Sequence, residues 1–345
     1  MNIEIGLGGV LNIPGVSGYG REKITKCRED LNAIRSGCCF DYLEGIPASK
    51  DLADWAEDEG FPYRVFTGLY VPGGVDGHPD GLEVLKQNLE ICAKYPTINT
   101  LNMQVLGNND SPSFDELYRF YEQAEELAVA QRVQLTTETH IDRFTYDPSR
   151  MLAVHEYLKR ESRGKLGLNI WADFSHYVHQ MENAVCMKNH PAFAPGRRPG
   201  RADFEAVVDQ VIHSDLIVGG HLRCAAPSSL GRECGAIQYP IVAPSSDPYA
   251  DVTDALRFHG TWQEERTYVW KKVYRTLFAH VGKSEGNGTL RFASEFIRCE
   301  DDYNMDGYTN YWQNLNVIAW AKSVLDEMEN LRGNAALTLT PGKTE

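Results

Sequence analysis

The sequence contains no apolar run long enough to cross a membrane and no Cys-x-x-Cys pair. A membrane-spanning helix needs about 20 consecutive apolar residues, so we expect no membrane contact. Zinc ribbons and small disulfide scaffolds need closely spaced cysteines, whereas eight cysteines are scattered here along 345 residues. No secretory signal, with a basic start and an apolar core, is visible. We therefore expect a cytoplasmic protein with reduced thiols.

Basic residues are in deficit, with 34 Lys and Arg against 48 Asp and Glu and a formal net charge of -14. Proteins that bind nucleic acid present basic surfaces to the phosphates, so this balance argues against a nucleic-acid partner. It also fits poorly with an anionic membrane surface. The segment Gly6-Leu-Gly8-Gly9 lacks the full dinucleotide-binding fingerprint and a helix directly after it, which argues against a Rossmann enzyme.

Short β-rich runs alternate with longer amphipathic stretches along the whole chain. Such alternation is typical of parallel strands covered by helices. We predict strands at residues 2–9, 38–43, 62–70, 98–106, 132–139, 166–173, 214–221 and 289–295. We predict helices near residues 20–35, 49–59, 81–94, 114–131, 148–162, 203–212, 262–282 and 308–329. Strands and helices of equal number predict an α/β fold, a (β/α)8 TIM barrel.

Two stretches, residues 177–202 and 222–261, break this rhythm with prolines and few periodic apolar positions. Both follow predicted strands, the sixth and the seventh, so in a barrel these long loops fall on the catalytic face. Loops longer than about fifteen residues usually serve as lids or binding loops, or are disordered. We expect a single barrel domain over residues 1–332 and a mobile C-terminal tail over residues 333–345.

Four polar residues of metal-ligand type stand at the ends of predicted strands five to eight: Glu138, Asp173, His221 and Glu295. In a parallel barrel the C-terminal ends of the strands converge on one mouth. Two Glu, one Asp and one His suit a divalent metal ion such as Mn, Co, Mg or Zn. One acid at a strand end is more often solvated or a helix cap, but four groups of ligand type on consecutive strands predict a metal site.

Two further histidines stand near these strand ends. His140 lies on the same strand face as Glu138, because strand side chains alternate, and it is either a base or a group that bonds a carboxylate. His176 follows Asp173 closely enough to belong to the same site. For His179, one turn further on, a structural or surface role is an equal alternative.

These motifs resemble the xylose isomerase-like TIM barrels, a group that includes sugar epimerases, hydroxypyruvate isomerases, inosose dehydratases and endonuclease IV. That family places its metal ligands on strands five to eight in the order Glu, Asp, His, Glu, which is the order found here. Asp173-Phe-Ser-His176 keeps the family's spacing, and His221-Leu-Arg223 matches its His-x-Lys or His-x-Arg segment. Cys224 is a departure, because acidic residues often follow that segment in the family.

The resemblance implies a divalent-metal-dependent sugar isomerase or epimerase that abstracts a proton next to a carbonyl through a metal-stabilised enediolate. In the family's epimerases the Glu residues on strands five and eight form the base and acid pair, which implies that Glu138 and Glu295 are catalytic. The resemblance further implies that His176 and Arg223 bind a small-molecule carbohydrate substrate. Barrels of this kind often pair through their faces, which implies a homo-oligomer.

Two alternatives stay open. The first is a metal-dependent lyase that performs β-elimination on a 3-oxo-glycoside, as the C-glycoside-cleaving members of the superfamily do. His140 suits the base of that reaction, and this alternative implies a complex with a second subunit. The other is a catalytically silent barrel that binds sugar or scaffolds a partner. Metal-dependent DNA repair is disfavoured by the negative charge and by the lack of further histidines for a trinuclear site.

Overall fold

The alternating strands and helices of the sequence close into a barrel in this computed structural model. It describes residues 2–8, 28, 31–32, 35, 39–75, 77–107, 112–140, 143–177, 201–227, 236–238, 241, 264–282, 288–296 and 307–338. The barrel strands are β1 (Asn2–Leu7), β2 (Tyr42–Glu44), β3 (Tyr63–Tyr70), β4 (Thr100–Val105), β5 (Gln134–Glu138), β6 (Ile170–Asp173), β7 (Ile217–Leu222) and β10 (Thr289–Ser294).

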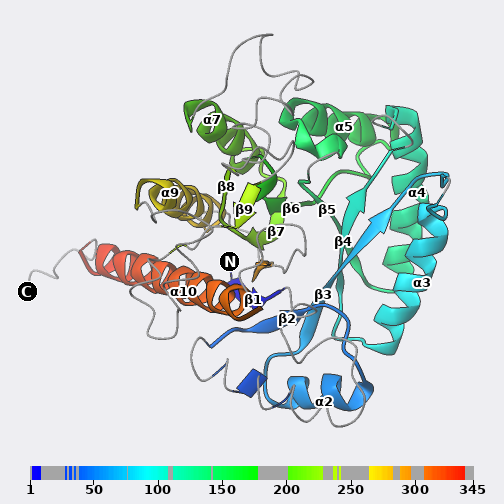
Figure 1. The fold of residues 1–345 in the computed structure, drawn as a ribbon. Coiled ribbons are helices and arrows are strands. Elements are labelled where there is room, and N and C mark those ends of the chain that lie inside the picture. The colour runs from blue at the N-terminus through cyan, green and yellow to red at the C-terminus, as the bar shows by residue number, and fades with distance from the viewer. Residues whose placement is uncertain are drawn as a thin grey trace, which may run out of the picture.

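Helices follow the strands and cover the outside of the barrel (Figure 1). They are α2 (Lys50–Asp58), α3 (Gly81–Lys94), α4 (Phe114–Ala130), α5 (Pro148–Glu161), α7 (Arg201–Ile212), α9 (Glu264–Val281) and α10 (Gly307–Thr338), with a short 3-10 helix η2 (Phe144–Tyr146) before α5. Every barrel strand pairs in parallel with its neighbours in the sequence, and β1 pairs with β10 to close the ring. The predicted (β/α)8 TIM barrel is confirmed.

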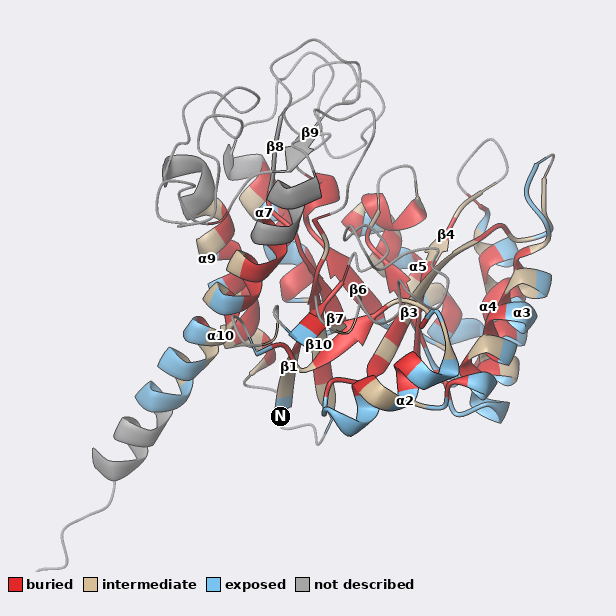
Figure 2. Cartoon of the chain, turned by 60° about the horizontal axis from the view of Figure 1, so that its bottom comes forward, coloured by how far each residue is buried: buried red, intermediate tan, exposed pale blue. Residues whose placement is uncertain are grey.

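The helix α4 shows why these segments adopt their local structure. The Ser113 hydroxyl accepts the Glu116 N–H at 3.3 Å, and the Glu116 carboxylate accepts the Ser113 N–H at 2.7 Å. This reciprocal capping box satisfies N–H groups that have no partner inside the helix. The apolar face of α4 is buried at helical spacing, with Leu117, Phe120, Ala124 and Ala128 each almost fully covered. The main core therefore lies between the helices and the outer face of the strands (Figure 2).

The inside of the barrel is filled in layers, because alternate residues of each strand point inward. At the N-terminal end, Arg291 pairs with Glu4 at 2.9 Å and donates to the Thr100 hydroxyl at 3.3 Å. Above this ionic layer lies a separate apolar cluster of Tyr42, Val65, Trp171 and Ala293. The third layer, at the C-terminal ends of the strands, is polar and carries the predicted site residues.

Two glycines make room for the large rings of the middle layer. A Cβ at Gly6 would collide with the ring of Tyr42, and a Cβ at Gly219 would collide with the ring of Trp171. Tyr42 and Trp171 are almost completely buried, at 0% and 1% exposure. The absence of side chains on β1 and β7 at these points therefore lets two aromatic rings fill the barrel beneath the polar layer.

The second strand differs from its prediction. We predicted residues 38–43, whereas β2 begins at Tyr42 and ends at Glu44. Cys39 has a φ of 48°, a left-handed conformation that an extended strand does not contain. The strand therefore starts late and places an acid, Glu44, at its C-terminal end.

The sixth strand also starts late, at Ile170 and not at residue 166, and several predicted segments lie largely outside the described residues. Of the predicted helix at 20–35, the structure describes helical residues at 28, 31–32 and 35. The long stretches after the sixth and seventh strands are described only in part, and β8 (Ala225–Pro227) pairs there antiparallel with β9 (Ala236–Gln238). The helix α10 continues to Thr338, past the predicted start of the tail at residue 333, and it extends away from the barrel (Figure 2).

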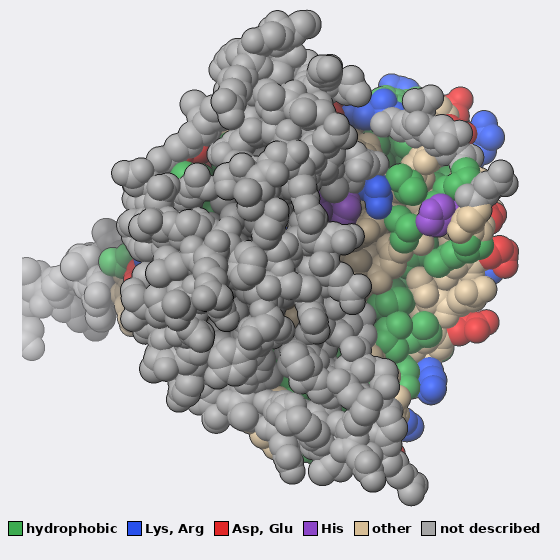
Figure 3. Space-filling model, viewed as in Figure 1, with side chains coloured by type: hydrophobic (Ala, Val, Ile, Leu, Met, Phe, Trp, Pro, Cys, Tyr) green, Lys and Arg blue, Asp and Glu red, His purple; other side chains and the backbone are tan. Residues whose placement is uncertain are grey.

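Within the part of the chain that the structure describes, no helix has the length and apolar character needed to span a membrane. Charges of both signs are interspersed along the described edge that carries α3 and α4 (Figure 3).

Candidate metal centre

The four predicted ligands come together at the C-terminal mouth of the barrel. Glu138 ends β5, Asp173 ends β6, His221 lies in β7, and Glu295 directly follows β10. One ligand atom from each lies within 4.8 Å of the others. Glu138, Asp173 and His221 are buried to 1% exposure or less, and the side chain of Glu295 is 17% exposed. The parallel barrel thus turns four residues that are distant in sequence into one cluster.

The imidazole of His221 presents its two nitrogens to different partners. Nδ1 faces the cluster, at 3.3 Å from Glu295, 3.6 Å from Asp173 and 3.8 Å from Glu138. It is buried and makes no hydrogen bond to the described residues. Nε2 lies 3.1 and 3.2 Å from the two carboxylate oxygens of Glu44. Nδ1 therefore points to three carboxylates at ion-pair distances, as a metal ligand would.

The carboxylate of Glu138 is held through one oxygen only. Its Oε2 accepts N–H groups from Asn102 at 2.6 Å and from Gln104 at 3.1 Å. Its Oε1 is buried and has no hydrogen-bond partner among the described residues. A buried carboxylate oxygen without a donor is costly, and a cation in the cluster would compensate it.

Asp173 is oriented through both of its oxygens. Oδ1 accepts the Ser175 N–H at 2.9 Å and the Ser175 hydroxyl at 2.6 Å. Oδ2 accepts Nη2 of Arg223 at 2.7 Å and faces the cluster at 3.6 Å from Nδ1 of His221. The loop that follows β6 therefore fixes the carboxylate in place.

The guanidinium of Arg223 lies against the same carboxylates. Its Nε donates to the Ser175 hydroxyl at 2.8 Å, and its Nη1 lies 3.2 Å from Glu295. Nη2 also lies 2.9 Å from Nε2 of His176. The residue is only 6% exposed, so its single positive charge compensates part of the negative charge at the mouth.

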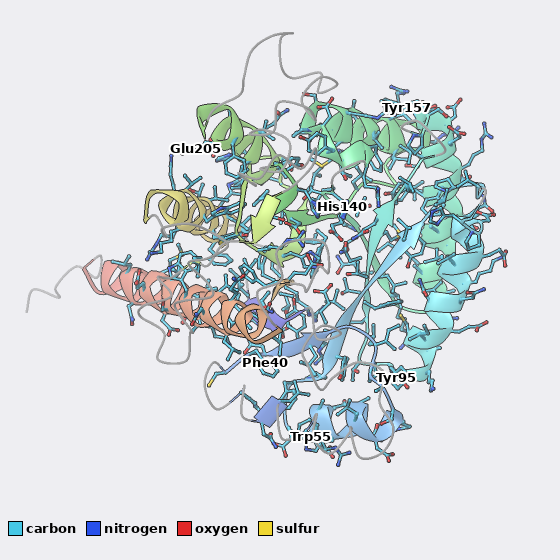
Figure 4. All side chains as sticks on the ribbon, viewed as in Figure 1. Phe40, Trp55, Tyr95, His140, Tyr157 and Glu205 are labelled. Carbon is cyan, nitrogen blue, oxygen red and sulfur yellow. The ribbon has the colours of Figure 1, made fainter. Side chains whose placement is uncertain are left out.

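His140 and His176 form a pair beside this cluster. Their ring centroids are 3.8 Å apart with an interplanar angle of 38°, and Nε2 of His176 lies 3.7 Å from Oε1 of Glu138. Figure 4 shows His140 near the middle of the molecule, where β5 and β6 converge. Glu138, His140 and His176 could by spacing form a second ligand group. The Arg223 guanidinium beside His176 opposes a further cation there, because like charges repel at this distance.

Two of the three carboxylates in the cluster, Glu295 and Asp173, have pKa values that shift in opposite directions. Burial, helped by the charge of Glu138, raises the pKa of Glu295 to about 8 against the attraction of His221 and Arg223. Burial also disfavours the ionised form of Asp173, yet the Arg223 guanidinium holds the pKa of Asp173 well below its usual value. At neutral pH the metal-free site therefore keeps Asp173 ionised and favours a proton on Glu295.

The histidines also differ. Burial pushes the pKa of His221 down, but the carboxylates of Glu295 and Glu44 raise it overall to well above the usual value. Burial lowers the pKa of His176 to about 3, against the attraction of Asp173. His176 is therefore a neutral imidazole at neutral pH, whereas His221 holds a proton that a metal ion would displace.

The residues fit a divalent cation. The cluster offers three carboxylates and one imidazole, a donor set that suits Mn, Mg, Co or Zn. Two of its buried atoms, Nδ1 of His221 and Oε1 of Glu138, have no hydrogen bond among the described residues and face one another across the cluster. Against the carboxylates stands the single guanidinium of Arg223, so the charge of a divalent ion would balance the site.

The structure places all the predicted site residues at this mouth: Glu138, His140, Asp173, His176, His221, Arg223 and Glu295. Sequence analysis missed Glu44, Asn102 and Gln104, which contact the ligands from β2 and β4. Asn102 and Gln104 are two residues apart, so both point into the barrel. Two amide side chains at alternate positions of an otherwise apolar strand were the signal in the sequence that could have indicated their place in the site.

No family model matches the sequence, and no curated protein matches it. Solved structures match its fold. A xylose isomerase-like TIM barrel protein from Mycobacterium smegmatis in complex with magnesium aligns with a TM-score of 0.53 and 11% identity, over 92% of this chain and 97% of that chain. IOLI protein with a binding zinc atom aligns with a TM-score of 0.53 and 10% identity, over 92% and 97% of the two chains.

The probable 3-DHS dehydratase AsbF from Bacillus anthracis aligns with a TM-score of 0.51 and 12% identity, over 91% of this chain and 98% of that chain. At such identities the likeness concerns the fold. The chain has the xylose isomerase-like TIM-barrel fold, as the resemblance in its motifs predicted. Its chemistry has to be argued from its own residues.

Proposed function

We propose that this protein is a divalent-metal-dependent isomerase or epimerase that acts on a free sugar or sugar derivative by moving a proton next to a carbonyl. The observation that carries the proposal is the convergence of Glu138, Asp173, His221 and Glu295 at the barrel mouth, with ligand atoms within 4.8 Å of one another. A divalent ion bound by these residues would polarise a substrate carbonyl and stabilise the negative charge that develops on it.

Glu138 and Glu295 are suited to opposite halves of a proton transfer. Glu138 is held through Oε2 by Asn102 and Gln104, which leaves Oε1 directed into the site as an acceptor. Glu295 is the candidate ligand whose side chain is partly exposed, and burial raises its pKa to about 8 in the metal-free protein, so its surroundings favour a proton whenever the carboxylate is not bound to metal. In our proposal Glu138 takes the proton from carbon, and Glu295 returns one to the substrate.

Arg223 and His176 are suited to bind substrate oxygens. Ser175 and Asp173 hold the Arg223 guanidinium at 2.8 and 2.7 Å, so its orientation is fixed before a substrate arrives. His176 is neutral at neutral pH and lies beside both Arg223 and Glu138. A neutral imidazole can donate to or accept from a sugar hydroxyl without adding charge to the site.

The pair of His140 and His176 favours a second candidate, a lyase. The ring centroids of His140 and His176 are 3.8 Å apart. The imidazole of His140 therefore lies close enough to the cluster to act as the base. A base and a polarised carbonyl also suffice for β-elimination on a 3-oxo-glycoside. The aligned dehydratase shares the fold at a TM-score of 0.51, which is compatible with elimination chemistry on this scaffold. The lyase proposal carries with it a complex with a second, different subunit. The isomerase proposal carries with it a homo-oligomer.

The first experiment is metal analysis of purified wild type beside Glu138→Ala, Asp173→Ala, His221→Ala and Glu295→Ala, with circular dichroism of each. We expect about one equivalent of Mn, Co, Zn or Mg in wild type and its loss in folded variants. A wild-type protein that takes up no metal after incubation with each ion contradicts the proposal and favours the silent barrel.

The second experiment is turnover in deuterium oxide with a panel of aldoses and ketoses, and separately with 3-oxo-glycosides. Deuterium in an isomerised sugar supports the isomerase, whereas release of the aglycone supports the lyase. His140→Gln separates them further, because it should abolish the elimination and leave isomerisation in place. Metal uptake without either reaction supports a barrel that only binds sugar or a partner. A Glu295→Ala variant that keeps every activity of wild type would support the same reading.

A further inference from the structure

Glu44 is a buried acid that the predicted ligand set does not contain. It ends β2 and is 7% exposed. Both of its carboxylate oxygens lie within hydrogen-bond distance of Nε2 of His221, at 3.1 and 3.2 Å. The two residues are far apart in sequence, and the closure of the barrel brings them together from β2 and β7.

The Glu44 carboxylate is itself held in place. The Thr67 hydroxyl donates to Oε1 of Glu44 at 2.6 Å, and Asn102 lies 3.2 Å from the same hydroxyl. Asn102 also donates to Oε2 of Glu138 at 2.6 Å. A hydrogen-bonded chain thus runs from His221 on β7 through Glu44, Thr67 and Asn102 to Glu138 on β5, so it has a predicted metal ligand at each end.

This contact decides which nitrogen of His221 faces the other ligands. A carboxylate offers only acceptors, so Nε2 of the imidazole carries the hydrogen that binds Glu44. Nδ1 is then directed to Asp173, Glu295 and Glu138, at 3.6, 3.3 and 3.8 Å. A ring turned by half a rotation would place carbon atoms where the two nitrogens now lie.

We infer that Glu44 is a positioning residue that orients His221 through Nε2–H and thereby presents Nδ1 as the metal ligand. The inference rests on the metal site of the proposed function, but it concerns ligand orientation and not the reaction. Groups that hold metal-binding histidines in this way commonly change metal affinity by roughly 10- to 100-fold when removed. Removal of the Glu44 carboxylate should therefore weaken metal binding, although Glu44 does not contact the substrate in our proposal.

The test compares Glu44→Ala with Glu44→Gln, whose side-chain oxygen can still accept the Nε2–H. Glu83→Ala, which removes an exposed acid on α3, is the matched control. Zinc and manganese affinities are measured by competition with a chelating dye. We expect a roughly 10- to 100-fold loss of affinity for Glu44→Ala, a smaller loss for Glu44→Gln and wild-type affinity for Glu83→Ala.

A second measurement reads the hydrogen bond itself. In protein labelled with 15N-histidine, a protected Nε2–H gives a one-bond N–H correlation, which is assigned to His221 by its disappearance in His221→Gln. We expect this signal to persist in wild type and Glu44→Gln, with or without metal, and to vanish through solvent exchange in Glu44→Ala. Affinity and signal that are unchanged in Glu44→Ala overturn the inference.

These readouts separate the inference from the proposed function. A wild-type protein that binds metal but catalyses no proton exchange refutes the proposed function, and the affinity series still decides the role of Glu44. If wild type binds no metal, the N–H correlation alone decides whether Glu44 orients His221. If wild type is catalytically active and Glu44→Ala keeps wild-type metal affinity and the N–H signal, the inference is refuted and the proposed function stands.

Discussion

Asn102 donates its side-chain N–H to Oε2 of Glu138 at 2.6 Å, from β4 to β5 inside the barrel. Both groups are almost completely buried, at 0% and 1% exposure. The bond uses one oxygen of the carboxylate and leaves the other to face His221. The amide of Asn102 therefore fixes which oxygen of the Glu138 carboxylate faces the candidate metal site.

Replacing that amide should weaken metal binding. In Asn102→Leu the Glu138 carboxylate keeps only Gln104 as a donor, so we expect metal affinity to fall roughly tenfold or more. Asn88→Leu is the matched control, because Asn88 is also a buried amide but bonds Tyr70 at 2.8 Å, away from the site. Calorimetric titration with manganese measures the difference. Equal affinities in the two variants would show that Asn102 does not orient the ligand.

Removal of the guanidinium at the mouth should destabilise the metal-free protein. Arg223→Met leaves Asp173 and Glu295 with the His221 imidazole as their positive neighbour and removes the buried guanidinium, which costs about 3–5 kcal/mol. Arg275→Met removes an exposed pair with Glu327 and should leave the free energy of unfolding close to that of wild type. Urea denaturation in EDTA measures both. Added metal should recover part of the loss in Arg223→Met only, and similar small losses in the two variants would contradict this prediction.

Metal affinity should rise with pH through neutrality. Glu295 has a pKa of about 8, and the pKa of His221 is raised well above its usual value, so both hold protons that a cation must displace. Asp173, with its lowered pKa, stays ionised and adds no dependence there. Calorimetry in buffers of different ionisation enthalpy should detect net proton release at pH of about 7. A metal affinity that is the same in acidic and in alkaline buffer would contradict this prediction.

The middle layer of the barrel should not tolerate a methyl group at Gly219. Its Cβ would collide with the ring of Trp171 and with the backbone oxygen of Arg291, so Gly219→Ala should lower the free energy of unfolding by about 1–3 kcal/mol. Gly288→Ala is the control, since nothing lies within 4 Å of a Cβ at that position. Thermal and urea unfolding compare the two. A Gly219→Ala variant as stable as Gly288→Ala would mean that the ring moves aside freely.

The order of strands and the positions of Glu138, Asp173 and His221 were predictable because each closes an apolar run, and parallel strands bring their C-terminal ends together. Periodicity predicts the strand ends, and the resemblance to the xylose isomerase-like barrels added the expectation that Glu138, Asp173, His221 and Glu295 bind a metal ion. The structure adds their distances and the direction of each donor atom.

Glu44 could not be predicted in the same way. The strand β2 has three residues, and Cys39, with a φ of 48°, ends the extended pattern that the sequence suggests from residue 38. Its register against β3 also shifts between Leu43 and Glu44. Short, irregular strands depend on their neighbours for their position, so the sequence alone does not show that Glu44 reaches His221.

Tyr42 and Trp171 fill the barrel above the pair of Glu4 and Arg291. A barrel interior packed in this way is not a pore, so solvent and any bound molecule reach the polar layer through the C-terminal mouth. A bound sugar would then stand between the bulk solvent and its own reacting carbon. The fraction of product that carries deuterium would measure how often the transferred proton exchanges with solvent before it returns to carbon.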